Sequence, residues 1–225
     1  QYLQNNVKQA IATLSSYVSK FPNGIHSLKA NFYLAQSYYA DGLEANAVAN
    51  YDYVIAQTKS EYTEQSLARL CEIHLKKDNY TKAIPVLRQL ETDADFPQNR
   101  TFAQANLMRS YYAQQDYPNA VIYADKVLEN PKTDNKVKSD AQIIVARSAI
   151  KANDESKARI AYSKLLAIAK GELAAEALYY DAYFKNKDGK FVESNKTVQK
   201  LAKDYSGYKY FGAKSLIVMA KNYYQ

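Results

Sequence analysis

Apolar residues recur along the chain in segments of about 15 residues, with the i, i+3, i+4 spacing of one face of an amphipathic helix. The break at 40–42 ends in Gly42, which can adopt the left-handed backbone conformation that stops a helix. Neither flanking segment can bury its apolar face alone, so the pattern predicts an antiparallel helical hairpin. The two faces consist of Leu28, Asn31, Leu34, Ala35 and Tyr38, and of Ala47, Val48, Tyr51, Val54 and Ile55.

The same pattern repeats along the whole chain. A small residue recurs early in the second segment of each pair, at intervals of 36 to 38 residues. Tyrosine pairs recur in the first segment, at 38–39, 111–112 and 223–224. Self-similarity at this period is typical of stacked helical hairpins, so we expect an all-α superhelix of about 12 antiparallel helices. The small residues are Ala10, Ala47, Ala83, Ala120, Ala158 and Ser194.

These repeats predict a single solenoid over residues 1–225. Residues 1–22 are expected to form the second helix of a preceding repeat, and residues 208–225 the first helix of a further one. Both ends then interrupt a repeat, which predicts a fragment of a longer solenoid with Leu216, Met219 and Ala220 uncovered. The expected hairpins between the ends span 25–60, 61–97, 98–134, 135–171 and 172–206.

The segments at 32–55, "FYLAQSYYADGLEANAVANYDYVI", and 107–131, "LMRSYYAQQDYPNAVIYADKVLENP", resemble the tetratricopeptide repeat (TPR). The resemblance implies a right-handed α–α superhelix in which the first helix of each hairpin lines a concave groove that binds a protein or peptide. Carried over position by position, it implies a groove formed by Phe32, Gln36, Tyr39, Arg109, Tyr112, Arg147, Tyr179 and Tyr183, and by Ile217, Lys221 and Tyr224 in the last helix.

Two links between hairpins begin with Phe-Pro, at 21–22 and 96–97. In this respect the chain resembles TPR proteins of the Gram-negative envelope, of the BamD-like and Tol–Pal coordinator-like kinds. The resemblance implies a periplasmic or outer-membrane-associated location, with the cytoplasm as the alternative.

Few residues suggest chemistry. Cys71 and His74 lie three apart on one helix face, but a metal site needs three or four ligands and the only other histidine is His26. Cys71 also occupies the small packing position of its repeat. Paired carboxylates at 91–95 are expected in a solvated loop, and no phosphate-binding or nucleophile motif is present. We therefore expect a non-enzymatic protein without metal or cofactor.

Charge gives a weak indication of the partner. The chain carries a net charge of +7, most of it after residue 112, which favours an acidic protein partner. No run of five like charges indicates nucleic-acid binding, and no apolar stretch reaches the roughly 18 residues of a membrane span.

The predicted function is a protein-interaction scaffold. The alternative is an envelope protein that binds carbohydrate or peptidoglycan, against which the lack of tryptophan counts. The sequence gives no indication of the oligomeric state.

Overall fold

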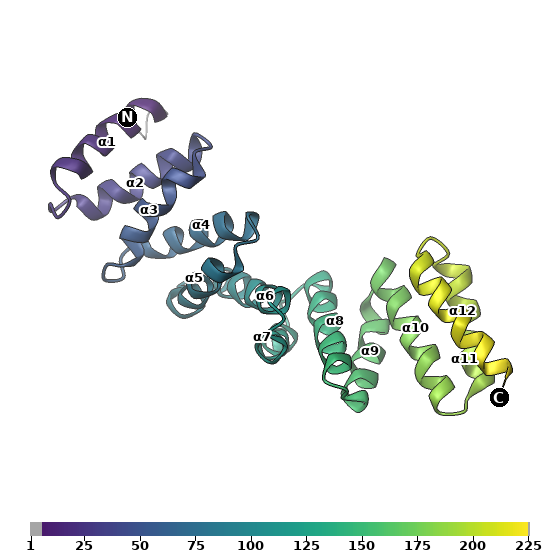
Figure 1. Ribbon diagram of the computed structural model, residues 1–225. Helices are drawn as coiled ribbons and strands as arrows, with labels where there is room; N and C mark the ends of the chain where they lie inside the picture. Colours follow the sequence, from purple (N-terminus) through teal and green to yellow (C-terminus); the bar gives the residue numbers. More distant parts are fainter. Residues whose placement is uncertain (1–5, 225) are drawn as a thin grey trace. The chain divides into compact units, whose positions relative to one another are not determined.

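The computed structural model describes residues 6–224, which form twelve α-helices and contain no β-strand (Figure 1). The architecture is therefore the all-α helical solenoid that the repeat predicts. The helices are α1 (Val7–Lys20), α2 (Ser27–Ala40), α3 (Glu44–Ile55), α4 (Thr63–Lys76), α5 (Tyr80–Asp93), α6 (Pro97–Ala113), α7 (Tyr117–Glu129), α8 (Asn135–Lys151), α9 (Glu155–Ile168), α10 (Gly171–Lys187), α11 (Phe191–Asp204) and α12 (Lys209–Tyr223).

The chain divides into two compact units. The first ends at Gln114 and contains α1 to α6, and the second begins at Gln115 and contains α7 to α12. Within each unit every helix packs on its neighbours in the sequence, and α10 also packs on α12. Nearest-neighbour packing of this kind is the hallmark of a solenoid. The single continuous solenoid over 1–225 stays a prediction.

The small residues of the repeat lie where paired helices approach each other. All six are buried: the exposed fraction is 1% for Ala10 and 0% for Ala47, Ala83, Ala120, Ala158 and Ser194. A side chain of one or two heavy atoms allows helix axes to come within about 8–10 Å. The burial of all six residues is what a close-packing role predicts.

The turns inside the hairpins share one backbone device. Gly42, Asp78, Gln115, Asn153 and Gly189 have φ of 75°, 51°, 62°, 56° and 71° and recur at the repeat period. In four of these turns the next residue donates its N–H to a carbonyl five positions back, as from Leu43 to Tyr38 at 2.8 Å. This bond and the left-handed residue are the marks of a Schellman helix end, so the backbone itself closes these four hairpins.

Helix α5 differs from one local expectation. It begins at Tyr80 under an Asn79 cap and continues through Pro85, which is exposed. The carboxylates at 91–95 were expected in a loop, but α5 runs on to Asp93, so Glu91 and Asp93 are helical. A proline on the solvent side of a helix leaves its unpaired carbonyl to water, which explains why α5 tolerates it.

The last helix leaves part of its apolar surface uncovered. Leu216 and Ala220 of α12 are exposed, as predicted, whereas Met219 is half-buried against the core shared by α10, α11 and α12.

Candidate functional site

Three of the predicted groove residues are buried. Phe32 packs its ring on Tyr62, with centroids 4.7 Å apart, and Tyr179 packs on Phe211 at 6.2 Å. Gln36 is also buried, and its Nε2 has no hydrogen-bond partner among residues 6–224. These three side chains lie on the predicted helices but serve the core, so they offer a partner little surface.

Tyr39 belongs to a polar cluster that joins α2 to α4. Its hydroxyl donates to Glu72 at 3.1 Å, and the Arg69 guanidinium lies 4.6 Å from its ring centroid. Arg69 also pairs with Glu72 at 2.7 Å. Burial, with the neighbouring Glu72 carboxylate, raises the pKa of Tyr39. The second tyrosine of the first pair is therefore held by its own chain, while it keeps a half-exposed edge.

The remaining predicted positions differ in their surroundings. Arg109 and Tyr112 are half-buried on α6. Arg147 makes a bidentate ion pair with the buried Glu176, at 3.0 and 2.6 Å. The hydroxyl of Tyr162 donates to the same carboxylate at 2.9 Å, and burial raises the pKa of Tyr162. Arg147 thus fixes α8 to α10 and is not a free cation.

An aromatic and basic surface does lie on the first helices of the second unit. Tyr183 stacks on Tyr179 at 6.3 Å, and Lys214 Nζ lies 4.7 Å from the Tyr179 ring and 5.1 Å from the exposed ring of Tyr210. The face of α12 continues through exposed residues at i+3 and i+4 steps. We name as the α10–α12 surface the residues Tyr183, Tyr210, Lys214, Ile217, Lys221 and Tyr224.

Sequence reasoning missed Tyr210 and Lys214 on this surface. They lie seven and three residues before Ile217, on the same helical face. Extending that spacing backwards from Ile217 would have found both.

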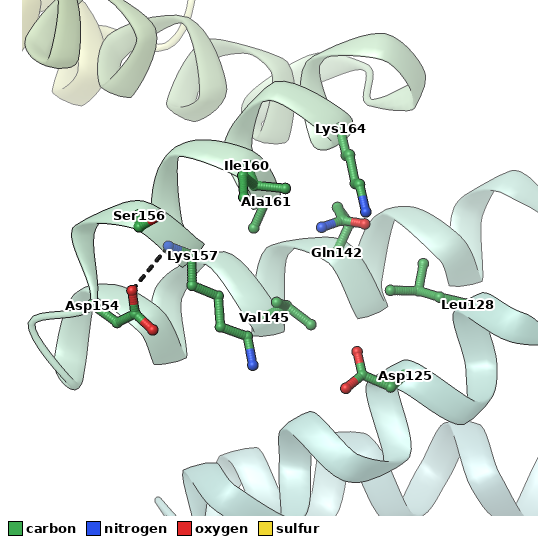
Figure 2. Close-up of a pocket in the computed structure, with 10 residues that line it drawn as sticks. All are labelled: Asp125, Leu128, Gln142, Val145, Asp154, Ser156, Lys157, Ile160, Ala161 and Lys164. Carbon is green, nitrogen blue, oxygen red and sulfur yellow. Dashed lines mark hydrogen bonds between the residues drawn. The ribbon is translucent and has the colours of Figure 1, made fainter.

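A hollow in the second unit was not predicted at all (Figure 2). It has a volume of about 450 Å³ and lies where α7, α8 and the start of α9 meet. Asp125 and Leu128 come from α7, and the other lining residues are Gln142, Val145, Asp154, Ser156, Lys157, Ile160, Ala161 and Lys164.

The Cys71–His74 pair is buried in the first unit. Cys71 is completely buried, and burial raises the pKa of its thiol. Within residues 6–224, no three His, Cys, Asp or Glu side chains are grouped so that they could hold a metal ion. In the same part of the chain, no helix is both long and apolar enough to cross a bilayer.

His74 gives a testable pH dependence. Burial lowers its pKa, and Lys82 and Lys77 act in the same direction, while Asp52 opposes them. The folded state therefore binds a proton less readily than the unfolded state, whose pKa is about 6.5. We expect the stability contributed by neutral His74 to be full above that value and to fall as the pH drops below it. Urea unfolding at pH 7.5 and 5.5 should show this loss.

The matched variant is His74→Tyr, because Tyr38 and Tyr111 occupy the equivalent positions. It should unfold with a smaller difference between the two pH values, whereas His26→Asn, at an exposed histidine, should keep the wild-type difference. Equal pH dependence of His74→Tyr and wild type would contradict the assignment.

Solenoids of stacked helical hairpins present extended surfaces that can bind other molecules. Residues 1–24 match the family model of the tetratricopeptide repeat. A tetratricopeptide repeat protein from Parabacteroides merdae, known from its crystal structure, is similar to this chain with a TM-score of 0.50 and 14% identity. The likeness covers 97% of this chain and 86% of that one, and it shows the fold. The comparison with curated proteins gives no match. The resemblance to BamD-like and Tol–Pal coordinator-like proteins stays a prediction.

Proposed function

We propose that this protein is a non-catalytic interaction scaffold that binds an acidic protein or peptide on the α10–α12 surface. The observation that carries the proposal is the exposed combination of aromatic rings and lysines on two adjacent first helices. Tyr210 and Tyr224 expose most of their side chains, with Lys214 and Lys221 on the same face of α12.

The chemistry of this surface suits an interface. Tyrosine contributes area and a hydrogen-bonding group at low entropic cost, and such residues are enriched in interface cores. Lys214 lies over two rings, so an acidic group of a partner would meet a cation held in place by cation–π contacts. Lysines at the rim would chiefly raise the rate of association with an acidic partner.

The proposal predicts that Lys214→Glu/Lys221→Glu loses its partner. We expect capture from a cell extract to fall at least tenfold relative to wild type, because two attractive charges become repulsive. Recovery is measured by quantitative mass spectrometry after pull-down. The control is Lys196→Glu/Lys200→Glu on exposed positions of α11, which changes the net charge equally. Equal recovery of every captured protein by both double variants would refute this surface.

Carbohydrate binding is a second candidate, favoured by the exposed rings of Tyr210, Tyr223 and Tyr224. Sugars stack on such rings, and the intrinsic tyrosine fluorescence should then change on titration with peptidoglycan fragments. A flat titration, together with a captured protein that depends on Lys214 and Lys221, leaves the scaffold function.

We further propose a cell-envelope location, on the strength of the two Phe-Pro links. Fractionation of the organism's cells, followed by immunoblotting, tests it, and recovery with the cytoplasmic fraction would contradict it.

A further inference from the structure

The hollow of Figure 2 is one end of a longer groove in the second unit. A second hollow of about 590 Å³ adjoins it and shares Asp154 and Lys157. Its other lining residues include Tyr117, Pro118 and Val121 of α7 and Ser148 and Ala149 of α8. Each volume falls within the range of about 300–1,000 Å³ that is typical of ligand clefts. We name the two together the α7–α9 groove.

The floor of this groove carries two buried polar side chains without partners. Gln142 is 5% exposed and Ser148 is 4% exposed, and both belong to α8. The Ser148 hydroxyl is fully buried and has no hydrogen-bond partner within residues 6–224. The Gln142 amide faces the hollow in Figure 2, and the structure gives it no side-chain hydrogen bond to residues 6–224. Buried polar groups normally have partners, because leaving one unmade costs about 1–3 kcal/mol.

The other repeats act as an internal control for Gln142. At the equivalent position Gln104 donates to Glu91 at 3.0 Å, and Asn31 donates to the Ser27 carbonyl at 2.8 Å. The residue equivalent to Glu91 next to Gln142 is Leu128, one repeat period later. The polar floor residue is thus kept while its partner within the chain is replaced by an apolar side chain.

The walls and rim indicate what can occupy the groove. Leu128, Val145 and Ile160 provide apolar walls. Lys151, Lys157 and Lys164 are exposed at the rim, and the structure gives none of them an ion pair. Two carboxylates also line the groove. Asp154 caps α9 by accepting from the Lys157 backbone N–H at 2.9 Å. The other carboxylate, Asp125 on α7, has no such capping role.

We infer that the α7–α9 groove binds an extended peptide segment with an acidic residue next to an aliphatic one. An extended backbone leaves its N–H and C=O groups free, and the Gln142 amide can accept from the former and donate to the latter. In a helix these backbone groups are already hydrogen-bonded to each other. The aliphatic side chain occupies the space between Leu128, Val145 and Ile160. The acidic side chain lies on the α9 side, near Lys157 and Lys164 and away from Asp125.

This site is separate from the α10–α12 surface, and the test distinguishes them. The probe is a phage-displayed random heptapeptide library, selected on the complete 225-residue chain. We expect wild type to enrich peptides that carry Asp or Glu beside Val, Leu or Ile. Lys157→Glu/Lys164→Glu should lose this enrichment, whereas Lys214→Glu/Lys221→Glu should keep it.

Gln142→Leu is the sharpest variant, because Leu67 and Leu178 occupy its equivalent positions in other repeats. We expect the most enriched peptide, synthesised with blocked ends, to bind this variant at least tenfold more weakly by calorimetry. The variant should unfold at the same or higher urea concentration than wild type, since an apolar side chain replaces an amide to which the structure gives no side-chain hydrogen bond.

Three results would overturn the inference. They are the absence of any enriched peptide on wild type, enrichment that survives both groove variants, and enrichment that Lys214→Glu/Lys221→Glu abolishes. The last result would assign the peptide to the α10–α12 surface instead.

Discussion

Replacing Glu64 with glutamine is expected to lower the free energy of unfolding by about 3 kcal/mol. Glu64 is 8% exposed on α4, and its carboxylate accepts hydrogen bonds from Asp95 N at 3.0 Å, Phe96 N at 3.1 Å and Asn99 Nδ2 at 2.7 Å. These donors belong to the link that starts α6. A glutamine keeps one acceptor oxygen but turns an NH₂ group towards N–H donors, so at least one donor is left unpaired.

Urea denaturation followed by circular dichroism measures this loss. The control is Glu61→Gln, which removes the same charge from an exposed position three residues away and should change stability by no more than about 0.5 kcal/mol. A loss below 1 kcal/mol for Glu64→Gln would show that the link is held by its apolar contacts instead.

Arg147→Ala is expected to cost about 3 kcal/mol, the lower end of the range for breaking a buried ion pair. The Glu176 side chain is 4% exposed, while that of Arg147 is 40% exposed. Water therefore solvates the arginine charge in part but does not solvate the glutamate charge. The variant leaves a buried carboxylate with the Tyr162 hydroxyl as its remaining hydrogen bond among those that the structure gives it.

The double variant Arg147→Met/Glu176→Leu separates the cost of an unpaired buried charge from the cost of lost packing around the arginine stem. Replacing both charges with apolar groups of similar volume should recover part of the lost stability, since neither charge is then buried unpaired while the buried Tyr162 hydroxyl loses its acceptor on Glu176. Thermal and urea unfolding of the single and double variants test this. A double variant as unstable as Arg147→Ala would show that the packing of the arginine stem matters more than the charge on Glu176.

The helical repeat could be predicted from the sequence because each hairpin carries a small residue at the same position. Ala47, Ala83, Ala120 and Ala158 repeat one geometric requirement, close helix approach, so even the serine at 194 did not obscure it. That serine is buried and donates to the Ala182 carbonyl at 2.8 Å, which satisfies the hydroxyl.

The binding positions were harder to predict. The first helix of a hairpin packs on several neighbours, so periodicity alone does not show which of its faces is exposed. Phe32 and Tyr179 were predicted to line the groove but are buried. Arg147 was predicted as a groove residue, and its ion pair was not foreseen because the partner, Glu176, is 29 residues away and carries no sequence signal. The α7–α9 groove depends on a single exchange, Leu128 where the preceding repeat has Glu91.

The left-handed hairpin turns have a consequence for how such a chain can evolve. Because a backbone hydrogen bond closes four of these turns, glycine, aspartate and asparagine all occupy the same position in them. The turn therefore places little demand on the side chain, and recombination between genes at this point would join a first helix from one repeat to a second helix from another without a mismatch in the turn. New combinations of binding faces can then arise by exchange of half-repeats, with selection acting afterwards on the contacts between neighbouring helices.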